Sequence, residues 1–264
     1  MASPPGILGR ILEAKRQELG NLRRHLPELR RAAQEAPPPR DFLAALRQAP
    51  PPAIIAEVKR ASPSAGELRP GLDPAELARA YRTGGAAALS VLTDAPFFQG
   101  SLEDLARARA AAGLAVLRKD FILAPEQLYE ARAAGADAVL LIAAALEPVL
   151  LAELYHLARE LGLAVLLEVH HRRELEAALA LKPPLMAVNN RNLETMQVDL
   201  EHCLRLRPLI PPEVTVVAAS GIQDHHDLER LARGGLDAFL VGTSLVRAPD
   251  PAAALRRLRG EEAA

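Results

Sequence analysis

The chain reads Gly135-Ala136-Asp137-Ala138-Val139-Leu140 near its middle, and residues 235–240 repeat this pattern as Gly-Leu-Asp-Ala-Phe-Leu. In each copy a glycine that can end a helix is followed by an apolar run typical of a buried strand. Residues 113–117 and 162–166 repeat a related pattern, Gly-Leu-Ala-Val-Leu. We therefore expect a chain built from repeated strand-and-helix units.

Apolar runs of this kind recur along most of the chain, and an amphipathic helical pattern follows each of them. The runs begin near Ile54, Ala87, Leu114, Ala138, Leu163, Leu185, Val214 and Ala238. Eight such units of roughly 30 residues predict an α/β protein, a single (β/α)8 TIM barrel. The alternative is a doubly wound open sheet, which would more often carry a glycine-rich dinucleotide loop after its first strand; none is present here.

The first part of the chain lies outside this repeat. Apolar residues from Ile7 to about Leu26 have helical spacing and predict an amphipathic helix that ends before Pro27, and a short helical piece follows around Phe42–Leu46. A segment this short rarely holds a core of its own. We predict an N-terminal helical extension, residues 1–50, packed on a barrel of residues 51–264.

Composition narrows the function classes. The 264-residue chain has a net charge of −1 and only 3% aromatic residues, which argues against a nucleic-acid partner. The single cysteine, Cys203, excludes an internal disulfide, and no Cys/His cluster has zinc spacing, so we expect a reducing compartment and no metal. We also expect the histidine pairs at 170–171 and 225–226 to be solvated or to cap helices.

No apolar run is long enough to span a membrane, and the charged start of the chain lacks a signal-peptide core. These features predict a cytoplasmic protein without a membrane partner, either a monomer or a weak homo-oligomer. The bias toward Arg, Ala, Leu and Pro fits a thermophile, although codon bias would give much the same composition.

Charged residues stand where the chemistry of such a barrel gathers, at the C-terminal ends of the strands. The first predicted strand ends in Glu57 and Lys59, the third in Lys119 and the fifth in Glu168. Because side chains alternate along a strand, two lysines and two carboxylates are expected to converge on one mouth. There, burial and pairing would tune their pKa values for proton transfer. Each could instead belong to a buried structural ion pair.

The last two predicted strands end in glycine and hydroxyl residues. Ser220-Gly221 closes the seventh, and Gly242-Thr243-Ser244 closes the eighth. Glycines let backbone N–H groups approach an anion, and the loops after strands seven and eight are the recurrent phosphate site of these barrels. The alternative is a pair of tight turns with hydroxyl N-caps. Together the two loops favour a phosphorylated ligand.

Several motifs, taken in order, resemble those of the indole-3-glycerol-phosphate synthase family. They are residues 55–64, 97–101, 117–121, 167–170, 188–193 and 220–222, and the resemblance covers nearly the whole chain. It implies a carbon–carbon lyase of tryptophan biosynthesis without a cofactor. Such an enzyme closes 1-(2-carboxyphenylamino)-1-deoxyribulose 5-phosphate to indole-3-glycerol phosphate, with loss of CO2 and water.

The resemblance also implies roles for individual residues. Lys119 would be the general acid that protonates the ribulose carbonyl. Lys59 would hold the substrate carboxylate and act as an acid when the hydroxyl leaves. Glu57 and Glu168 would exchange protons, with their division of labour open. Of the other residues, Asn189 would hold a substrate hydroxyl or Glu57; Ser220 would be catalytic; Ser62, Gly221, Gly242, Thr243 and Ser244 would surround the phosphate; and Pro63, Phe98, Phe121 and Arg191 would border the anthranilate ring.

One position departs from the family pattern. The family usually has Glu before the Ser-Gly of strand seven, and this chain has Ala219. Two other functions stay open, of which only the first is motivated by Ala219. One is a non-catalytic sugar-phosphate-binding barrel. The other is a different sugar-phosphate enzyme, such as phosphoribosylanthranilate isomerase or a tryptophan-synthase α-like lyase, in which paired lysines on strands one and three are not expected.

Overall fold

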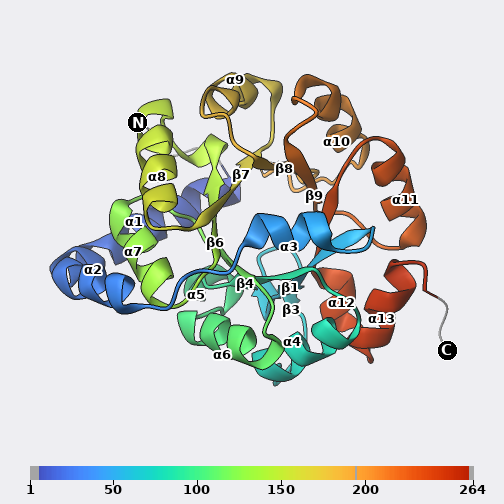
Figure 1. Ribbon diagram of the computed structural model, residues 1–264, viewed down its shortest axis with the longest axis horizontal. Coiled ribbons are helices and arrows are strands. Elements are labelled where there is room, and N and C mark those ends of the chain that lie inside the picture. The colour runs from blue at the N-terminus through green and yellow to red at the C-terminus, as the bar shows by residue number, and fades with distance from the viewer. Residues whose placement is uncertain (1–5, 194, 262–264) are drawn as a thin grey trace.

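The computed structural model describes residues 6–193 and 195–261. Within them, eight parallel strands form a closed barrel in the order β1-β10-β9-β8-β7-β6-β5-β4 (Figure 1). The strands are β1 (Ala53–Val58), β4 (Ala88–Leu92), β5 (Val116–Lys119), β6 (Ala138–Ile142), β7 (Ala164–Val169), β8 (Leu185–Asn189), β9 (Thr215–Ala219) and β10 (Ala238–Val241). The predicted (β/α)8 barrel is confirmed, and closure between β1 and β10 rules out the open sheet.

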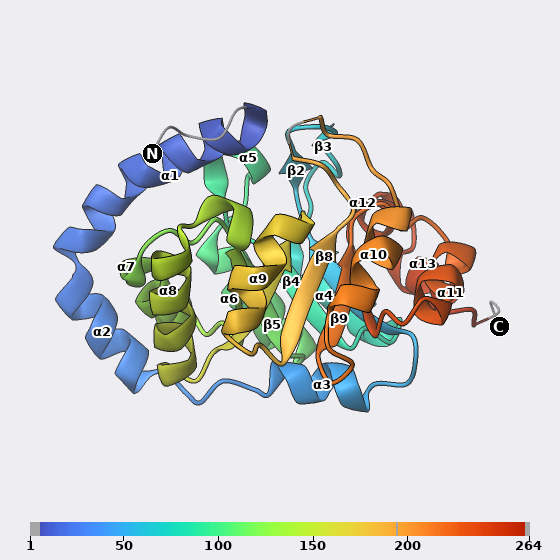
Figure 2. The same cartoon turned by 90° about the horizontal axis from the view of Figure 1, so that it is seen from above.

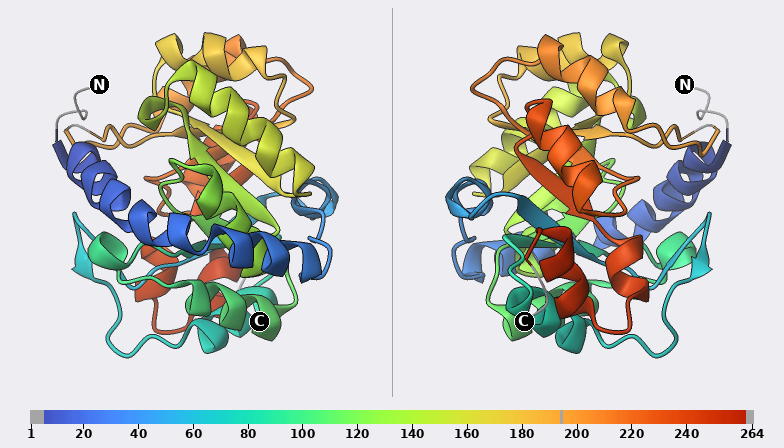
Figure 3. Two further views of the ribbon diagram at one scale, coloured as in Figure 1. Left: turned by 90° about the vertical axis from the view of Figure 1, so that its left-hand side faces the viewer. Right: turned by 90° about the vertical axis from the view of Figure 1, so that its right-hand side faces the viewer.

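Helices surround the barrel on the outside, as the two opposite views of Figure 3 show. They are α4 (Pro74–Thr83), α6 (Leu102–Ala112), α7 (Pro125–Ala133), α8 (Pro148–Glu160), α9 (Arg172–Ala180), α10 (Glu201–Leu206), α11 (His225–Arg233) and α13 (Pro251–Leu258). Side-chain caps start several of them: Asp73, Ser101 and Asp250 each accept an N–H from the first turn. Shorter elements are α5 (Ala95–Phe98), α12 (Thr243–Arg247), the 3-10 turns Ala143–Ala145 and Arg207–Leu209, and the hairpin β2 (Ala61–Ser62) and β3 (Gly66–Glu67).

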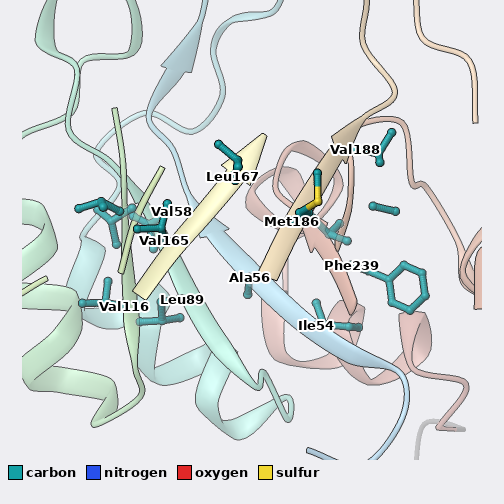
Figure 4. Close-up of a cluster of buried hydrophobic side chains, with 14 of the residues drawn as sticks. Ile54, Ala56, Val58, Leu89, Val116, Val165, Leu167, Met186, Val188 and Phe239 are labelled. Carbon is teal, nitrogen blue, oxygen red and sulfur yellow. The ribbon is translucent and has the colours of Figure 1, made fainter. Parts of the chain in front are cut away.

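The strands are buried on both faces, which divides the core into two layers. Outward side chains such as Ile54, Val116 and Leu167 pack against the helices (Figure 4). Inward side chains such as Leu117 and Leu166 fill the barrel. Because inward positions near the N-terminal ends are apolar, charged inward side chains are confined to the other end of the barrel.

The N-terminal extension passes from one end of the barrel to the other. Figure 2 shows α1 (Gly6–Arg24) near β2 and α5, at the end where the strands finish, and α3 (Phe42–Gln48) at the opposite end. Between them α2 (Leu26–Glu35) packs against α7. Phe42 and Leu46 of α3 are buried against inward strand residues and so close the bottom of the barrel.

Helix α2 was not predicted. The first helix ends before Pro27 as expected, at Arg24, but Pro27 then stands in the first turn of a second helix. Proline fits there because the first N–H groups of a helix have no partner inside it and the fixed φ of proline suits a helix. Proline therefore starts a helix at this point as well as ending one. No helix among the described residues is long and apolar enough to cross a membrane.

Candidate active site

A cavity of about 650 Å³ opens at the C-terminal end of the barrel. All the residues predicted from the sequence to act in catalysis or binding line this cavity: Glu57, Lys59, Ser62, Pro63, Phe98, Lys119, Phe121, Glu168, Asn189, Arg191, Ser220, Gly221, Gly242, Thr243 and Ser244. They come from the ends of strands that are far apart in the sequence. The predicted convergence of two lysines and two carboxylates therefore occurs.

Glu57 and Lys59 form an ion pair on the cavity wall. Lys59 Nζ lies 2.7 Å from Glu57 Oε1, and the Glu57 and Lys59 side chains are 6% and 14% exposed. The structural-pair interpretation is thus correct for this contact. Both residues nevertheless border the cavity, so a substrate can reach the charges that the pair holds.

Glu168 is buried and held from two sides. Its Oε1 accepts a hydrogen bond from Asn189 Nδ2 at 3.1 Å and lies 3.2 Å from His170 Nε2. Burial alone would raise the pKa of Glu168, but the charge of Lys119 and the contacts with His170 and Asn189 outweigh it and lower the pKa to about 2. Asn189 therefore contacts Glu168, a partner that the family resemblance did not imply, since it implied a substrate hydroxyl or Glu57.

Two loops form the glycine-rich side of the cavity. Ser220 has a φ of 69°, a left-handed conformation rare outside glycine, and its carbonyl accepts a hydrogen bond from Asn190 Nδ2. Gly221 has a φ of 87°, and a Cβ there would collide with Val198. A larger residue would therefore not fit at Gly221, and the backbone of both residues borders the cavity.

The alternative of hydroxyl N-caps is wrong for both loops. The N-cap of α12 is Gly242, which makes no side-chain cap, and the N-cap of α11 is Asp224. The first-turn N–H groups of α12, at Thr243 and Ser244, have no partner inside the helix. They are therefore suited to an anion, as is the nearby glycine-rich backbone.

Aromatic side chains border another side of the cavity. The rings of Phe98 and Phe121 lie 6.2 Å apart, centroid to centroid, and tilt by 33°. Arg191 lines the same cavity from the end of β8. It is fixed there, since its Nη1 donates to the Met196 carbonyl at 3.0 Å and its backbone N–H donates to Asn189 Oδ1 at 3.0 Å. The cavity therefore offers both flat apolar surface and a positive charge.

Residues of the N-terminal helix also line the cavity, which the sequence did not indicate. Ile7, Leu8 and Ile11 of α1 border its mouth, and so does Arg247 of α12. The helical spacing identified the α1 residues as a packing face, but no local pattern says what that face covers. Arg247 reaches the β2–β3 hairpin, where its Nη2 donates to the Ala65 carbonyl at 3.4 Å.

Lys15 joins α1 to the strand that carries Lys119. Its Nζ lies 3.0 Å from Asp120 Oδ1 and 3.1 Å from Asp94 Oδ2. Burial alone would raise the pKa of Asp120, but Arg118 and Lys15 outweigh it and lower the pKa to about 2. The buried network thus places an ionised carboxylate directly after Lys119.

Of the two histidine pairs, His170 departs from expectation, whereas His226 is exposed and His225 contacts the last carbonyl of α13, as expected. His170 is only 3% exposed and so is not solvated. His225 Nδ1 lies 3.0 Å from the Leu258 carbonyl, whereas His226 gathers with Asp224 and Asp227 within 4.8 Å on the surface. Exposed acidic groups of this kind are common without a metal, and Asp224 is already occupied as the N-cap of α11.

Gly242 offers a direct test of how tightly Glu57 is held. A Cβ at this position would lie 2.5 Å from Glu57 Oε1. We expect Gly242→Ala to displace Glu57 from Lys59 and to lower kcat/KM by about 100-fold, because small misplacements of a reacting group are costly. Steady-state kinetics measure kcat/KM, and thermal unfolding shows whether the variant stays folded. Gly20→Ala is the matched control, since nothing lies within 4 Å of its added Cβ; equal kinetics in the two variants would contradict the expectation.

Fold and site together define the class of this protein: a TIM barrel in which charged side chains and glycine-rich loops line one cavity at the C-terminal mouth. Residues 8–258 match the family model described as indole-3-glycerol phosphate synthase. The indole-3-glycerol phosphate synthase of Burkholderia vietnamiensis is 50% identical over 256 residues, covering 96% of this chain and 98% of that protein. That of Polaromonas naphthalenivorans is 48% identical over 260 residues, covering 97% and 99%.

The chain therefore belongs to the indole-3-glycerol phosphate synthase family. The sequence-based prediction of a carboxy-lyase of this family, acting in tryptophan biosynthesis, is confirmed. More distant solved structures share the fold alone. The thiamine phosphate pyrophosphorylase of Pyrococcus furiosus aligns with a TM-score of 0.58 at 18% identity, covering 79% of this chain and 93% of that one. A 3-hexulose-6-phosphate synthase aligns with a TM-score of 0.60 at 17% identity, covering 80% and 100%.

Proposed function

We propose that this cavity closes the indole ring of 1-(2-carboxyphenylamino)-1-deoxyribulose 5-phosphate and releases indole-3-glycerol phosphate, CO2 and water. The observation that supports this most is the convergence of Lys59, Lys119, Glu57 and Glu168 beside a glycine-rich anion pocket. The substrate carries a phosphate at one end and a carboxylate on an aromatic ring at the other. A cavity with basic residues, an anion pocket and paired aromatic rings matches each of these groups.

In the first step the ring carbon that bears the carboxylate attacks the ribulose carbonyl. Lys119 donates its proton to the carbonyl oxygen as the carbon–carbon bond forms, which prevents a negative charge from building up there. Lys59 holds the carboxylate until CO2 leaves and the electron pair returns to the ring. No external oxidant or reductant is needed for this step.

In the second step the hydroxyl formed from the carbonyl leaves as water. Lys59 is the acid that gives this hydroxyl a proton. At the same time the neighbouring methylene carbon loses a proton to a carboxylate. Glu57 and Glu168 share this exchange of protons, and Asn189 orients Glu168 or a substrate hydroxyl. The double bond that results completes the indole ring.

The remaining residues bind the substrate in this proposal. The phosphate is held by Ser62, Gly221, Gly242, Thr243 and Ser244, and the anthranilate ring is bordered by Pro63, Phe98, Phe121 and Arg191. Ser220, beside the phosphate, stays among the residues proposed to be catalytic. Helix N-terminal N–H groups and glycine backbone suit a phosphate dianion. Flat apolar side chains suit the ring.

The proposal is tested by incubating the purified protein with the carboxyphenylamino-deoxyribulose phosphate. Indole fluorescence should rise and one CO2 should be released for each product formed. Tight binding without product would favour the non-catalytic barrel. Conversion of phosphoribosylanthranilate in a parallel assay would favour the isomerase; we expect none.

Ala219 provides a second test of the cavity wall. It lies on the inward face at the end of β9, in register with Asn189, and is 3% exposed. Since the family usually has Glu here, we expect Ala219→Glu to raise kcat/KM by up to about tenfold by adding a hydrogen bond to the substrate. Ala219→Gln is the control for size without charge. Unchanged turnover in Ala219→Glu would show that this position matters little in this chain.

Other aspects rest on the sequence and remain part of the proposal. The extension of residues 1–50 is inferred to be a part of the active unit, because α1 lines the cavity, and the barrel of residues 51–264 carries the chemistry. A cytoplasmic, monomeric or weakly oligomeric protein fits the single free cysteine and the charge balance. A thermophilic source rests on the residue bias alone.

A further inference from the structure

A buried cluster of three titratable side chains lies behind the cavity wall. His170, Glu168 and Glu174 are 3%, 2% and 7% exposed. His170 Nε2 lies 3.2 Å from Glu168 Oε1, and His170 Nδ1 lies 3.9 Å from Glu174 Oε2. The imidazole thus stands between two carboxylates. Of the three, only Glu168 borders the cavity.

The polar atoms of this cluster are poorly satisfied. Glu168 Oε2, Glu174 Oε1 and both ring nitrogens of His170 have no aligned hydrogen-bond partner among the described residues. Each such buried group lowers the stability of the folded protein. A cluster selected for stability alone would not be expected to keep so many of them.

The backbone at His170 is, in contrast, firmly held. Its N–H donates to Glu174 Oε2 at 2.6 Å, and its carbonyl lies 2.6 Å from His202 Nε2, which donates because a carbonyl can only accept. The main chain of His170 is thereby fixed by α9 and α10, while its ring nitrogens keep their bonding capacity. These ring nitrogens lie next to the two carboxylates, Nε2 near Glu168 and Nδ1 near Glu174.

We propose that His170 is a positioning residue for Glu168, and that with Glu174 behind it the imidazole takes up and returns the proton that Glu168 exchanges with the substrate. This inference rests on the proposed function, in which Glu168 exchanges a proton during ring closure and dehydration. When Glu168 has been protonated, its O–H bond breaks and an N–H bond forms at Nε2. A carboxylic acid and a neutral imidazole become a carboxylate and an imidazolium, which Glu174 stabilises.

The charges around the cluster favour this exchange. Lys119 of β5 faces Glu168 from the cavity side, and Glu174 of α9 faces His170 from behind. His202 of α10 contacts the His170 carbonyl, and the charged or titratable groups around His202 are Arg205 of α10, His171 before α9, and Asp199. Asn189 of β8 contributes a neutral hydrogen bond. A positive charge on His170 is therefore flanked by two carboxylates and separated from Lys119 by one of them.

The test compares kcat and KM across pH for the wild type, His170→Gln and Glu174→Gln. We expect kcat of His170→Gln to fall by about 100-fold and that of Glu174→Gln by about tenfold, with KM within about twofold. In His170→Gln the acid limb of the kcat profile should move to higher pH, because Glu168 loses the positive partner that favours its ionised form. In Glu174→Gln it should move in the same direction but less, because His170 loses the carboxylate that stabilises its positive charge. Glu174→Gln keeps the size of the side chain and an oxygen that can accept the His170 N–H, so the fold should be retained.

His202→Gln is the control for a purely structural role. It disturbs the bond to the His170 carbonyl but not the ring between the carboxylates, so it should lower the melting temperature and leave the acid limb in place. The proposal is overturned if neither His170→Gln nor Glu174→Gln moves the acid limb, or if His202→Gln moves it equally.

A measurement without turnover separates this inference from the proposed function. In an NMR titration of the His170 ring, Glu168→Gln and Glu174→Gln should each lower the pH at which the ring loses its proton. An unchanged titration contradicts the inference. If the wild type forms no product, the proposed function fails in the assay, and the titration still decides whether His170 and Glu168 are coupled.

Discussion

Lys119→Met is expected to reduce kcat at least about a thousandfold while the barrel stays folded. The ammonium is the only part of the side chain that can protonate the ribulose carbonyl, and methionine replaces its length without its charge. The change has a second effect, because the charge of Lys119 is the largest single contribution that lowers the pKa of Glu168. Without it, Glu168 should bind a proton more readily. Turnover is measured by indole fluorescence and folding by circular dichroism.

The control for this variant is Lys182→Met, because Lys182 is exposed at the end of α9 and outside the cavity. Lys182→Met should keep wild-type kcat. Substrate binding to Lys119→Met, measured by calorimetry, should remain within about tenfold of the wild type, since the residues proposed to bind the phosphate are untouched. A Lys119→Met enzyme that retains a tenth of the wild-type kcat would contradict the assignment of Lys119 as the general acid.

Lys15→Met is expected to be the most destabilising of these substitutions, by about 3–5 kcal/mol in the free energy of unfolding. It leaves the buried carboxylates of Asp94 and Asp120, each 1% exposed at the side chain, without the ammonium that lies about 3 Å from both. Because Asp120 directly follows Lys119, kcat should fall as well. Urea unfolding and steady-state kinetics measure the two effects.

A double-mutant cycle isolates the pair from the rest of the network. Asp120→Asn removes the charge that Lys15 neutralises, so Lys15→Met should cost much less stability in that background. Arg118 remains as a partner of the residue at 120, with its Nη2 3.0 Å from Asp120 Oδ2 in the wild type. Additive effects of the two substitutions would mean that Lys15 acts through Asp94 or through packing.

Local patterns were enough to locate the strands and the charged ends of the barrel. The repeats of glycine and apolar residues identified all the barrel strands near their observed starts, since a strand buried on both faces needs a continuous apolar run. Side-chain alternation then placed Glu57, Lys119 and Glu168 on the inward face. In a closed parallel barrel the inward faces share one mouth, so their convergence followed from the fold.

What the sequence could not determine are contacts between segments that local periodicity does not relate. Lys15 shares the helical spacing of the apolar residues of α1, but nothing near it in the sequence indicates that Asp94 and Asp120 lie against it. His170 was expected to be solvated or to cap a helix, yet the packing of α9 and α10 buries it beside Glu168. Apolar spacing specifies which face of an element is buried. The partner that covers that face, and with it the pairing of each buried charge, depends on how the whole chain packs.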